Sequence, residues 1–149
     1  MRATSHLACV LTLLAAACTS TRVFPIPAGH PMVLVVENPK VIVPEFIFFL
    51  CSAFERHGIA TRTVKEKPPD AVVPHVTYTA IRGWDLGTYL TDAEIVVHHG
   101  DRVLGSAKYH LIGKGGLSLM KWQSVATKLT PVMDELLAAY PLSEQSTDG

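Results

Sequence analysis

Between Val73 and Ile112 the chain alternates apolar and polar residues in three runs that are separated by tight turns. Alternation with a period of two is typical of β-strands that have one buried face and one solvated face. The short turns favour consecutive antiparallel pairing. A Gly-rich bend at 113–116 then leads into a segment with helical periodicity. This stretch restricts the chain to folds in which helices cover one face of a largely antiparallel sheet.

The turn between the second and third runs determines which side chains share a face. Thr88 to His98 and Arg102 to Ile112 flank the residues 99–101. A two-residue turn would mix acidic and apolar residues on one face, whereas a three-residue turn separates them. We therefore expect a three-residue turn, with Gly100 in the left-handed conformation and Asp92 directly opposite Lys108. The expected buried face consists of Tyr89, Thr91, Ala93, Ile95, Val97, Val103, Gly105, Ala107, Tyr109 and Leu111.

The segment before the meander has the pattern of a β-α-β unit. Met32 to Val36 is an apolar run that predicts a buried strand. Pro44 favours the start of a helix and Gly58 its end, so a helix is expected over about 44–57. The alternating segment 59–64 then predicts a strand that is a parallel neighbour, or near neighbour, of the first.

The last periodic segment predicts a second helix from about Ser118 to Tyr140, in which Pro131 introduces a kink or a break. The complete pattern predicts an α+β domain. Two helices pack on one face of a four- to five-stranded mixed, largely antiparallel sheet, in the order β-α-β-β-β-β-α.

The N-terminal segment has the composition of a secretory signal peptide. Leu7 to Ala17 is apolar and uncharged, and it is shorter than the roughly 20 residues that cross a membrane as a helix. The sequence Leu14-Ala15-Ala16-Ala17-Cys18 resembles the lipobox of bacterial lipoproteins, although Ala15 stands where leucine is more common. An ordinary signal peptide cleaved at a nearby small residue is the alternative.

The lipobox resemblance implies that Cys18 is diacylated and becomes the first residue of the mature protein. The next residue is Thr19 rather than Asp, which by resemblance to the sorting rule of Gram-negative lipoproteins implies the outer membrane, facing the periplasm. We expect a signal peptide at 1–17, a lipid-anchored tether at 18–30, a single α+β domain at 31–141 and a disordered tail at 142–149.

Composition and motifs argue against several functions. Lys plus Arg and Asp plus Glu both number 13, and there is no basic stripe, so nucleic acid is not an expected partner. Cys51 is expected to be a buried small hydrophobe. His98, His99 and His110 are predicted to be too far apart to share a metal, so the histidines are expected to be exposed and unconnected. Asp85, Asp92 and Glu94 form no evident acid–base pair; we expect no catalytic site, metal or cofactor.

Three apolar residues are candidates for a contact surface. Ile47 and Phe48 widen the apolar stripe of the first predicted helix beyond one face. They are either covered by loops or exposed to a partner or to lipid. Trp84 lies in the bend 83–87, where it either closes the end of the sheet or stacks on a ligand.

Several short motifs resemble a group of small, uncharacterised proteobacterial envelope lipoproteins. The matching segments are Val76-Thr77-Tyr78-Thr79-Ala80, Gly83-Trp84-Asp85-Leu86, Tyr89-Leu90 and Ala93-Glu94-Ile95. The resemblance covers about 32–140, and that group has no established activity to transfer. The expected strand order is also similar to two-helix periplasmic lipoproteins that are accessory parts of envelope machines. The resemblance implies a non-enzymatic accessory or structural lipoprotein; a lipoprotein that binds lipid, glycan or a small ligand is the alternative.

Overall fold

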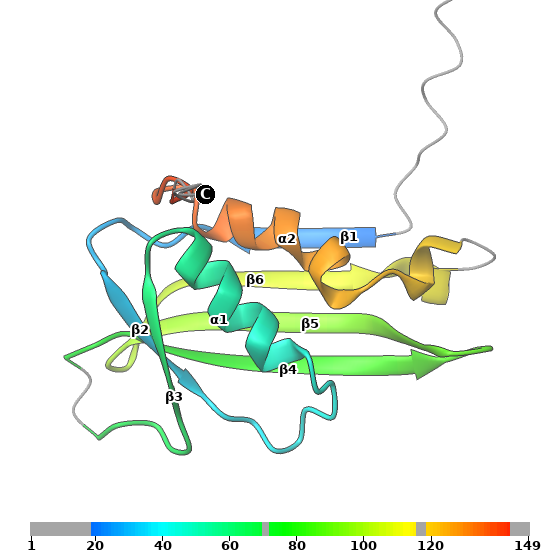
Figure 1. Ribbon diagram of the computed structural model, residues 1–149, viewed down its shortest axis with the longest axis horizontal. Helices are drawn as coiled ribbons and strands as arrows, with labels where there is room; N and C mark the ends of the chain where they lie inside the picture. The colour runs from blue at the N-terminus through cyan, green and yellow to red at the C-terminus, as the bar shows by residue number, and fades with distance from the viewer. Residues whose placement is uncertain (1–18, 70–71, 116–118, 144–149) are drawn as a thin grey trace, which may run out of the picture.

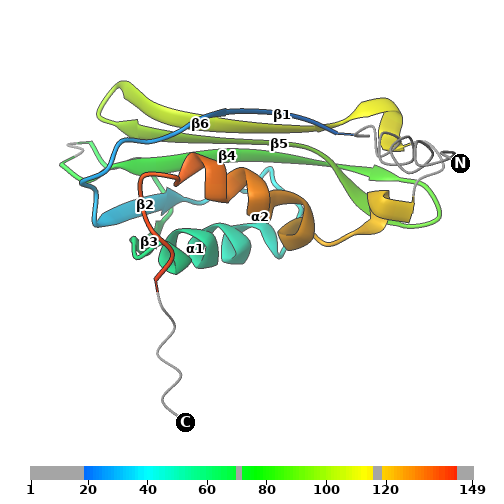
Figure 2. The ribbon, with the colours of Figure 1, turned by 90° about the horizontal axis from the view of Figure 1, so that it is seen from above.

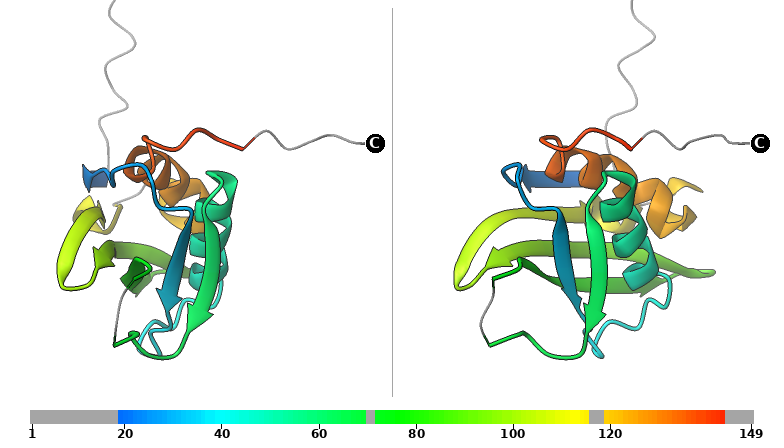
Figure 3. Two further views of the ribbon diagram at one scale, coloured as in Figure 1. Left: turned by 90° about the vertical axis from the view of Figure 1, so that its left-hand side faces the viewer. Right: turned by 60° about the vertical axis from the view of Figure 1, so that its left-hand side comes forward.

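The computed structural model describes residues 19–69, 72–115 and 119–143. They form one six-stranded mixed sheet in the order β1-β6-β5-β4-β2-β3, with both helices on the same side of the strands (Figures 1, 2 and 3). The elements are β1 (Thr19–Phe24), β2 (Met32–Val36), α1 (Phe46–Arg56), β3 (Ala60–Val64), β4 (His75–Trp84), β5 (Thr88–His99), β6 (Arg102–Leu111), the 3-10 helices η1 (Ile112–Gly115) and η2 (Leu119–Trp122), and α2 (Val125–Leu136). The predicted α+β class is confirmed, with six strands instead of four or five.

The β-α-β unit forms as the sequence predicts. β2 and β3 are parallel neighbours, with Met32 opposite Ala60. α1 ends before Gly58, whose positive φ of 72° is the left-handed conformation expected after a helix. The helix buries Phe46, Leu50, Ala53 and Phe54 against the sheet.

The β5–β6 hairpin has a different turn from the one expected. His99 pairs with Arg102, so the turn contains two residues, and Gly100 has the expected positive φ of 62°. A register shift between Val97 and His98 compensates for the shorter turn. This β-bulge adds the one residue that separates the apolar and acidic faces.

The bulge changes the cross-strand pairs. Lys108 lies opposite Glu94 rather than the predicted Asp92, with 2.9 Å between Nζ and Oε1. Asp92 instead pairs with His110, at 2.6 Å between Oδ1 and Nδ1. Val103, which was predicted to be buried, is 56% exposed because it lies on the turn side of the bulge, opposite His98.

The segment expected to be a tether belongs to the folded domain. Thr19 to Phe24 forms β1, which pairs antiparallel with β6, and Ile26 is buried in the core. Its polar composition concealed this strand. At the edge of the sheet, with most of its residues exposed, β1 contributes only the half-buried Val23 to the apolar cluster.

The C-terminal helix starts later than predicted and is not split at its proline. η2 occupies the first part of the expected helix, and α2 begins after Ser124, whose Oγ accepts a 3.1 Å hydrogen bond from the Thr127 backbone N–H. Pro131 is exposed inside α2, which continues to Leu136. Buried side chains on both sides of Pro131 hold the helix on the sheet and compensate for the missing backbone hydrogen bond.

Replacing Gly105 tests whether β1 and the following residues are part of the fold. A Cβ at this position would lie 2.5 Å from the Phe24 carbonyl oxygen and 2.7 Å from Cγ2 of Ile26. We expect Gly105→Ala to lower the free energy of unfolding by about 1–3 kcal/mol, because backbone must move to relieve the overlap. Urea denaturation measures this loss. Ser106→Ala is the matched control on the neighbouring residue; equal stability of the two variants would contradict this docking of β1.

Candidate functional site

Five exposed apolar side chains gather at one end of the sheet. Trp84 ends β4, Leu86 lies in the β4–β5 turn, Ile112 begins η1, and Leu119 and Met120 belong to η2. Their exposed fractions range from 51% for Ile112 to 88% for Leu86. We call these five residues the apolar tip. The elements that carry them meet at the end of the molecule on the right of Figure 1.

An ion pair between a buried lysine and a half-exposed aspartate joins the two halves of the apolar tip. Lys121 of η2 is only 4% exposed and pairs with Asp85 of the β4–β5 turn. The Trp122 indole N–H donates a 3.0 Å hydrogen bond to the Asp85 carbonyl oxygen. The Lys121 ammonium also lies over the Trp122 ring, 4.4 Å from its centroid. These contacts fix the turn that carries Leu86 against the helix that carries Leu119.

The β4–β5 turn has an unusual backbone conformation. Leu86 has a positive φ of 58°, which costs free energy for any residue with a Cβ. The Asp85 N–H donates to the Gly87 carbonyl oxygen across the turn, at 3.0 Å. Gly83 is required beside it, because a Cβ there would lie 2.7 Å from the Tyr89 ring. The turn therefore holds a large apolar side chain in solvent at a conformational cost.

The start of the described chain lies at the same end. Thr19 is paired with Leu111, the residue immediately before Ile112 of the apolar tip. β1 also contacts η1, and Figure 2 shows β1 alongside β6. Cys18 itself lies outside the described residues, so its predicted lipidation stays a prediction. Thr19, the residue that follows Cys18, adjoins the apolar tip.

The three predicted contact residues, Ile47, Phe48 and Trp84, do not lie together. Trp84 is 77% exposed, so the prediction that it closes the end of the sheet is wrong. Phe48 is 75% exposed on α1, whereas Ile47 is half-buried and packs against the core. The structure therefore groups Trp84 with residues that sequence reasoning missed. The available signal was the set of large apolar residues in two Gly-rich segments, Leu86 in one and Leu119 and Met120 in the other.

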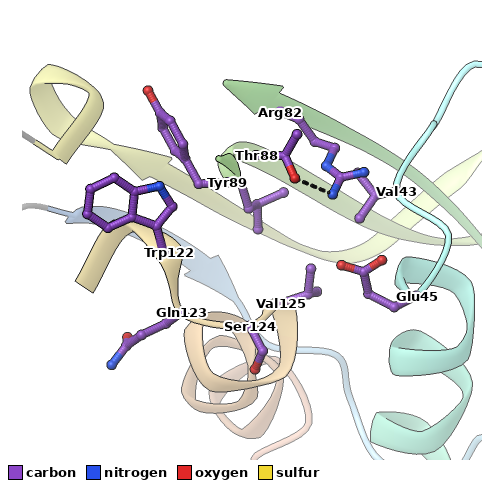
Figure 4. Close-up of a pocket in the computed structure, with 10 residues that line it drawn as sticks. Val43, Glu45, Arg82, Thr88, Tyr89, Trp122, Gln123, Ser124 and Val125 are labelled. Atoms are coloured by element: carbon purple, nitrogen blue, oxygen red, sulfur yellow. Dashed lines mark hydrogen bonds between the residues drawn. The ribbon is translucent and has the colours of Figure 1, made fainter. Parts of the chain in front are cut away.

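Among the cavities lined by described residues, two lie near the helices, and Trp84 lines neither. The first, of about 110 Å³, lies between the start of α2, the β4–β5 hairpin and the loop before α1 (Figure 4). Arg82 beside it donates hydrogen bonds to Thr88 Oγ1 and to the Ile42 carbonyl oxygen. The second, of about 260 Å³, is a more open groove along the start of α1. Its lining residues are Glu37, Asn38, Pro39, Val41, Val43, Pro44, Ile47 and Tyr78.

The sequence led us to expect exposed, unconnected histidines, and for His75 and His98 this expectation is wrong. His75 is 2% exposed and stacks on His98 of β5, with ring centroids 4.9 Å apart and planes 13° apart. His98 Nε2 is 3.0 Å from Thr77 Oγ1, and Nδ1 of His75 has no hydrogen-bond partner. Burial lowers the pKa of both rings, and the Lys67 ammonium lowers both further. Pairing of β4 with β5 brings together two histidines that are distant in sequence.

Several other ionisable groups form structural contacts. His57 is buried after α1, with Nε2 3.0 Å from Asp134 Oδ1, and Arg56 pairs with the same carboxylate. Burial lowers the pKa of Lys128, whose ammonium donates a hydrogen bond to the Leu90 carbonyl oxygen.

Among the residues described, no three His, Cys, Asp or Glu side chains are placed to hold one metal ion. No helix in this part of the chain is long and apolar enough to cross a membrane.

Solved structures provide the informative comparison with known proteins. No protein-family model and no curated protein matches the sequence. The PelC dodecamer from Paraburkholderia phytofirmans is similar, with a TM-score of 0.54, 12% identity and coverage of 81% of this chain and 98% of that chain. A point variant of the same dodecamer gives a TM-score of 0.51 at 11% identity, covering 81% of this chain and 95% of that chain. At this identity the likeness shows a shared fold.

Asp85→Ala tests the ion pair that joins the apolar tip. The change leaves the buried Lys121 ammonium without this carboxylate, so we expect the free energy of unfolding to fall by about 1–2 kcal/mol, the half-exposed position of Asp85 moderating the loss. Urea denaturation followed by tryptophan fluorescence measures the change. Asp92→Ala removes a carboxylate paired to a more exposed histidine and should cost less. A larger loss for Asp92→Ala would contradict the assigned role of Asp85.

The stacked histidines predict a stability that depends on pH. Because folding lowers the pKa of His75 and His98 below the unfolded value of about 6.5, the unfolded chain binds more protons as the pH falls through that value. Their stabilising contribution is complete above about pH 6.5 and declines below it. We expect His75→Phe, which keeps an aromatic ring against His98, to reduce the decline between neutral and mildly acidic pH.

Urea midpoints measured across this pH range give the slope. His110→Gln is the control, since His110 is an exposed histidine on the same sheet. Identical pH slopes for wild type and His75→Phe would show that the stacked pair does not titrate as described.

Proposed function

We propose that this chain is a lipid-anchored, non-enzymatic component of the Gram-negative cell envelope. Cys18 holds it to the outer membrane, and its domain faces the periplasm. The observation that carries the proposal is the position of Thr19, which begins β1 directly after the lipobox-like cysteine. Anchor and folded domain then adjoin without a tether, as suits a protein that works at the membrane surface.

An accessory or structural role in an assembly is favoured by the fold. The similar solved structures are dodecamers of PelC, which supports the idea that this fold is suited to assembly from several copies. In the described part of the chain, the sheet ends in two edge strands, β1 and β3. Edge strands have backbone groups available for pairing with another chain. We propose self-association or docking on an envelope protein through such surfaces.

The chemistry of the described side chains agrees with a non-enzymatic role. Asp85 pairs with Lys121, Glu94 with Lys108, and Asp92 with His110. The first pair stabilises the apolar tip and the other two join neighbouring strands. Asp85 therefore has its structural partner at the apolar tip, whereas Asp92 and Glu94 have theirs side by side on the polar face of β5 and β6.

Binding of a lipid, a glycan or a small ligand is the alternative function. Its best support is the groove beside α1, where Tyr78, Ile47 and the Asn38 amide surround about 260 Å³. This volume is slightly below the roughly 300–1,000 Å³ of ordinary ligand pockets, and the groove is open. The accessory role is therefore the stronger proposal.

Replacing the proposed anchor tests this function. Cells that express the wild-type protein, Cys18→Ala or Cys51→Ala would be labelled with a palmitate analogue and separated into soluble and membrane fractions. We expect label and outer-membrane location for wild type and Cys51→Ala, and loss of label for Cys18→Ala, because two acyl chains form a stable anchor. Unchanged labelling of Cys18→Ala would overturn the anchor.

Crosslinking in the same membranes tests the assembly. Covalent products that contain several copies, or one reproducible envelope partner, support the accessory role. A correctly anchored protein that yields only monomer would shift the function toward ligand binding.

A further inference from the structure

We propose that the apolar tip lies against the lipid bilayer, so that the domain has a fixed orientation on the membrane instead of pivoting on its acyl chains. The surface consists of Trp84, Leu86, Ile112, Leu119 and Met120. Its partner is a phospholipid headgroup layer and the upper part of the acyl chains. This inference rests on the proposed anchor at Cys18 for its direction, and on the tip's own side chains for its contact.

The position of the anchor determines which end of the molecule faces the bilayer. One residue of extended chain spans at most about 3.6 Å, so an acylated Cys18 holds Thr19 close to the headgroups. Thr19 pairs with Leu111, and Ile112 follows directly. The sheet end that carries the apolar tip is therefore brought to the membrane by the chain itself.

The side chains at this end have the chemistry of a membrane interface. Trp84 presents an indole that is 77% exposed, and tryptophan is enriched where hydrocarbon meets headgroups. Leu86 and Leu119 are 88% and 80% exposed. A group of large apolar residues in solvent marks a contact surface, and hydrocarbon is the partner that needs no complementary shape.

The charges near the apolar tip are compatible with this contact. Asp85 lies between Trp84 and Leu86, and its carboxylate is neutralised by the buried Lys121. Pairing lowers the cost of bringing this carboxylate to a lipid surface. The same pair holds the β4–β5 turn and η2 together, so the apolar residues approach the bilayer as one surface.

Fluorescence quenching of the complete, acylated protein in vesicles tests the contact. The vesicles contain phosphatidylethanolamine and phosphatidylglycerol, either unmodified or brominated in the upper part of their acyl chains. We expect bromine to quench the Trp84 emission about twofold, because an interfacial indole lies within reach of the upper chains. Trp84→Phe isolates the signal of Trp122, and the difference between the two proteins gives that of Trp84.

A second variant provides a matched control with an equally exposed indole elsewhere. Phe48 is 75% exposed on α1, away from the apolar tip. Adding Phe48→Trp to Trp84→Phe should introduce an emission that bromine does not quench. Equal quenching at both positions, or none at position 84 in vesicle-bound protein, would overturn the proposed orientation. A Trp84 emission that changes with protein concentration and not with bromine would instead indicate a second copy on the tip.

Failure of this inference can be separated from failure of the proposed function. Mass spectrometry of the purified protein first establishes whether Cys18 is acylated. Acylated protein with unquenched Trp84 rejects the tip contact and leaves the anchor in place. Protein without acyl chains that still binds vesicles with quenched Trp84 supports the tip contact and rejects the anchor.

Discussion

The side-chain alternation of β5 is the constraint on which the rest of this structure depends. β5 lies inside the sheet, between β4 and β6, and buries Ala93, Ile95 and Val97 under the helices. A shift of one residue would bury Asp92 and Glu94 in their place. Register shifts occur in both of its pairings, between Ile81 and Arg82 of β4 and next to Val97 in β5 itself. They accommodate the turns at both ends while the buried face remains apolar.

With the anchor that we propose at Cys18, attachment of β1 to the β6 edge gives this sheet a direction relative to the membrane. Gly105 allows the chain after β1 to pass close to β6, and Ile26 then enters the core. The domain is thereby continuous with the residue after Cys18. A flexible tether would have left every orientation accessible, whereas a paired strand holds one end of the sheet near the proposed anchor. In this proposal, packing at Gly105 contributes to orientation as well as to stability.

Local patterns in the sequence predicted the α+β class, the parallel β-α-β unit and the left-handed glycines at 58 and 100. They did not predict features that depend on distant partners. β1 is a polar edge strand with little inward-facing apolar surface, so its periodicity is weak. The stack of His75 on His98 requires the β4–β5 register. Trp84 was identified as a candidate, but the ion pair of Asp85 with Lys121, which joins η2 and its Leu119 to the β4–β5 turn, depends on a residue distant in sequence.

The energetics of the β4–β5 turn favour a functional explanation for its exposed residues. Leu86 occupies a left-handed conformation that glycine would adopt without strain. A turn optimised only for stability would have a small or polar residue there, and Lys121 would not need to be buried beside it. The chain instead spends conformational and desolvation free energy to hold a leucine in solvent. Such a cost is expected where the side chain gains a partner outside the domain, and the adjacent start of β1 indicates where that partner lies.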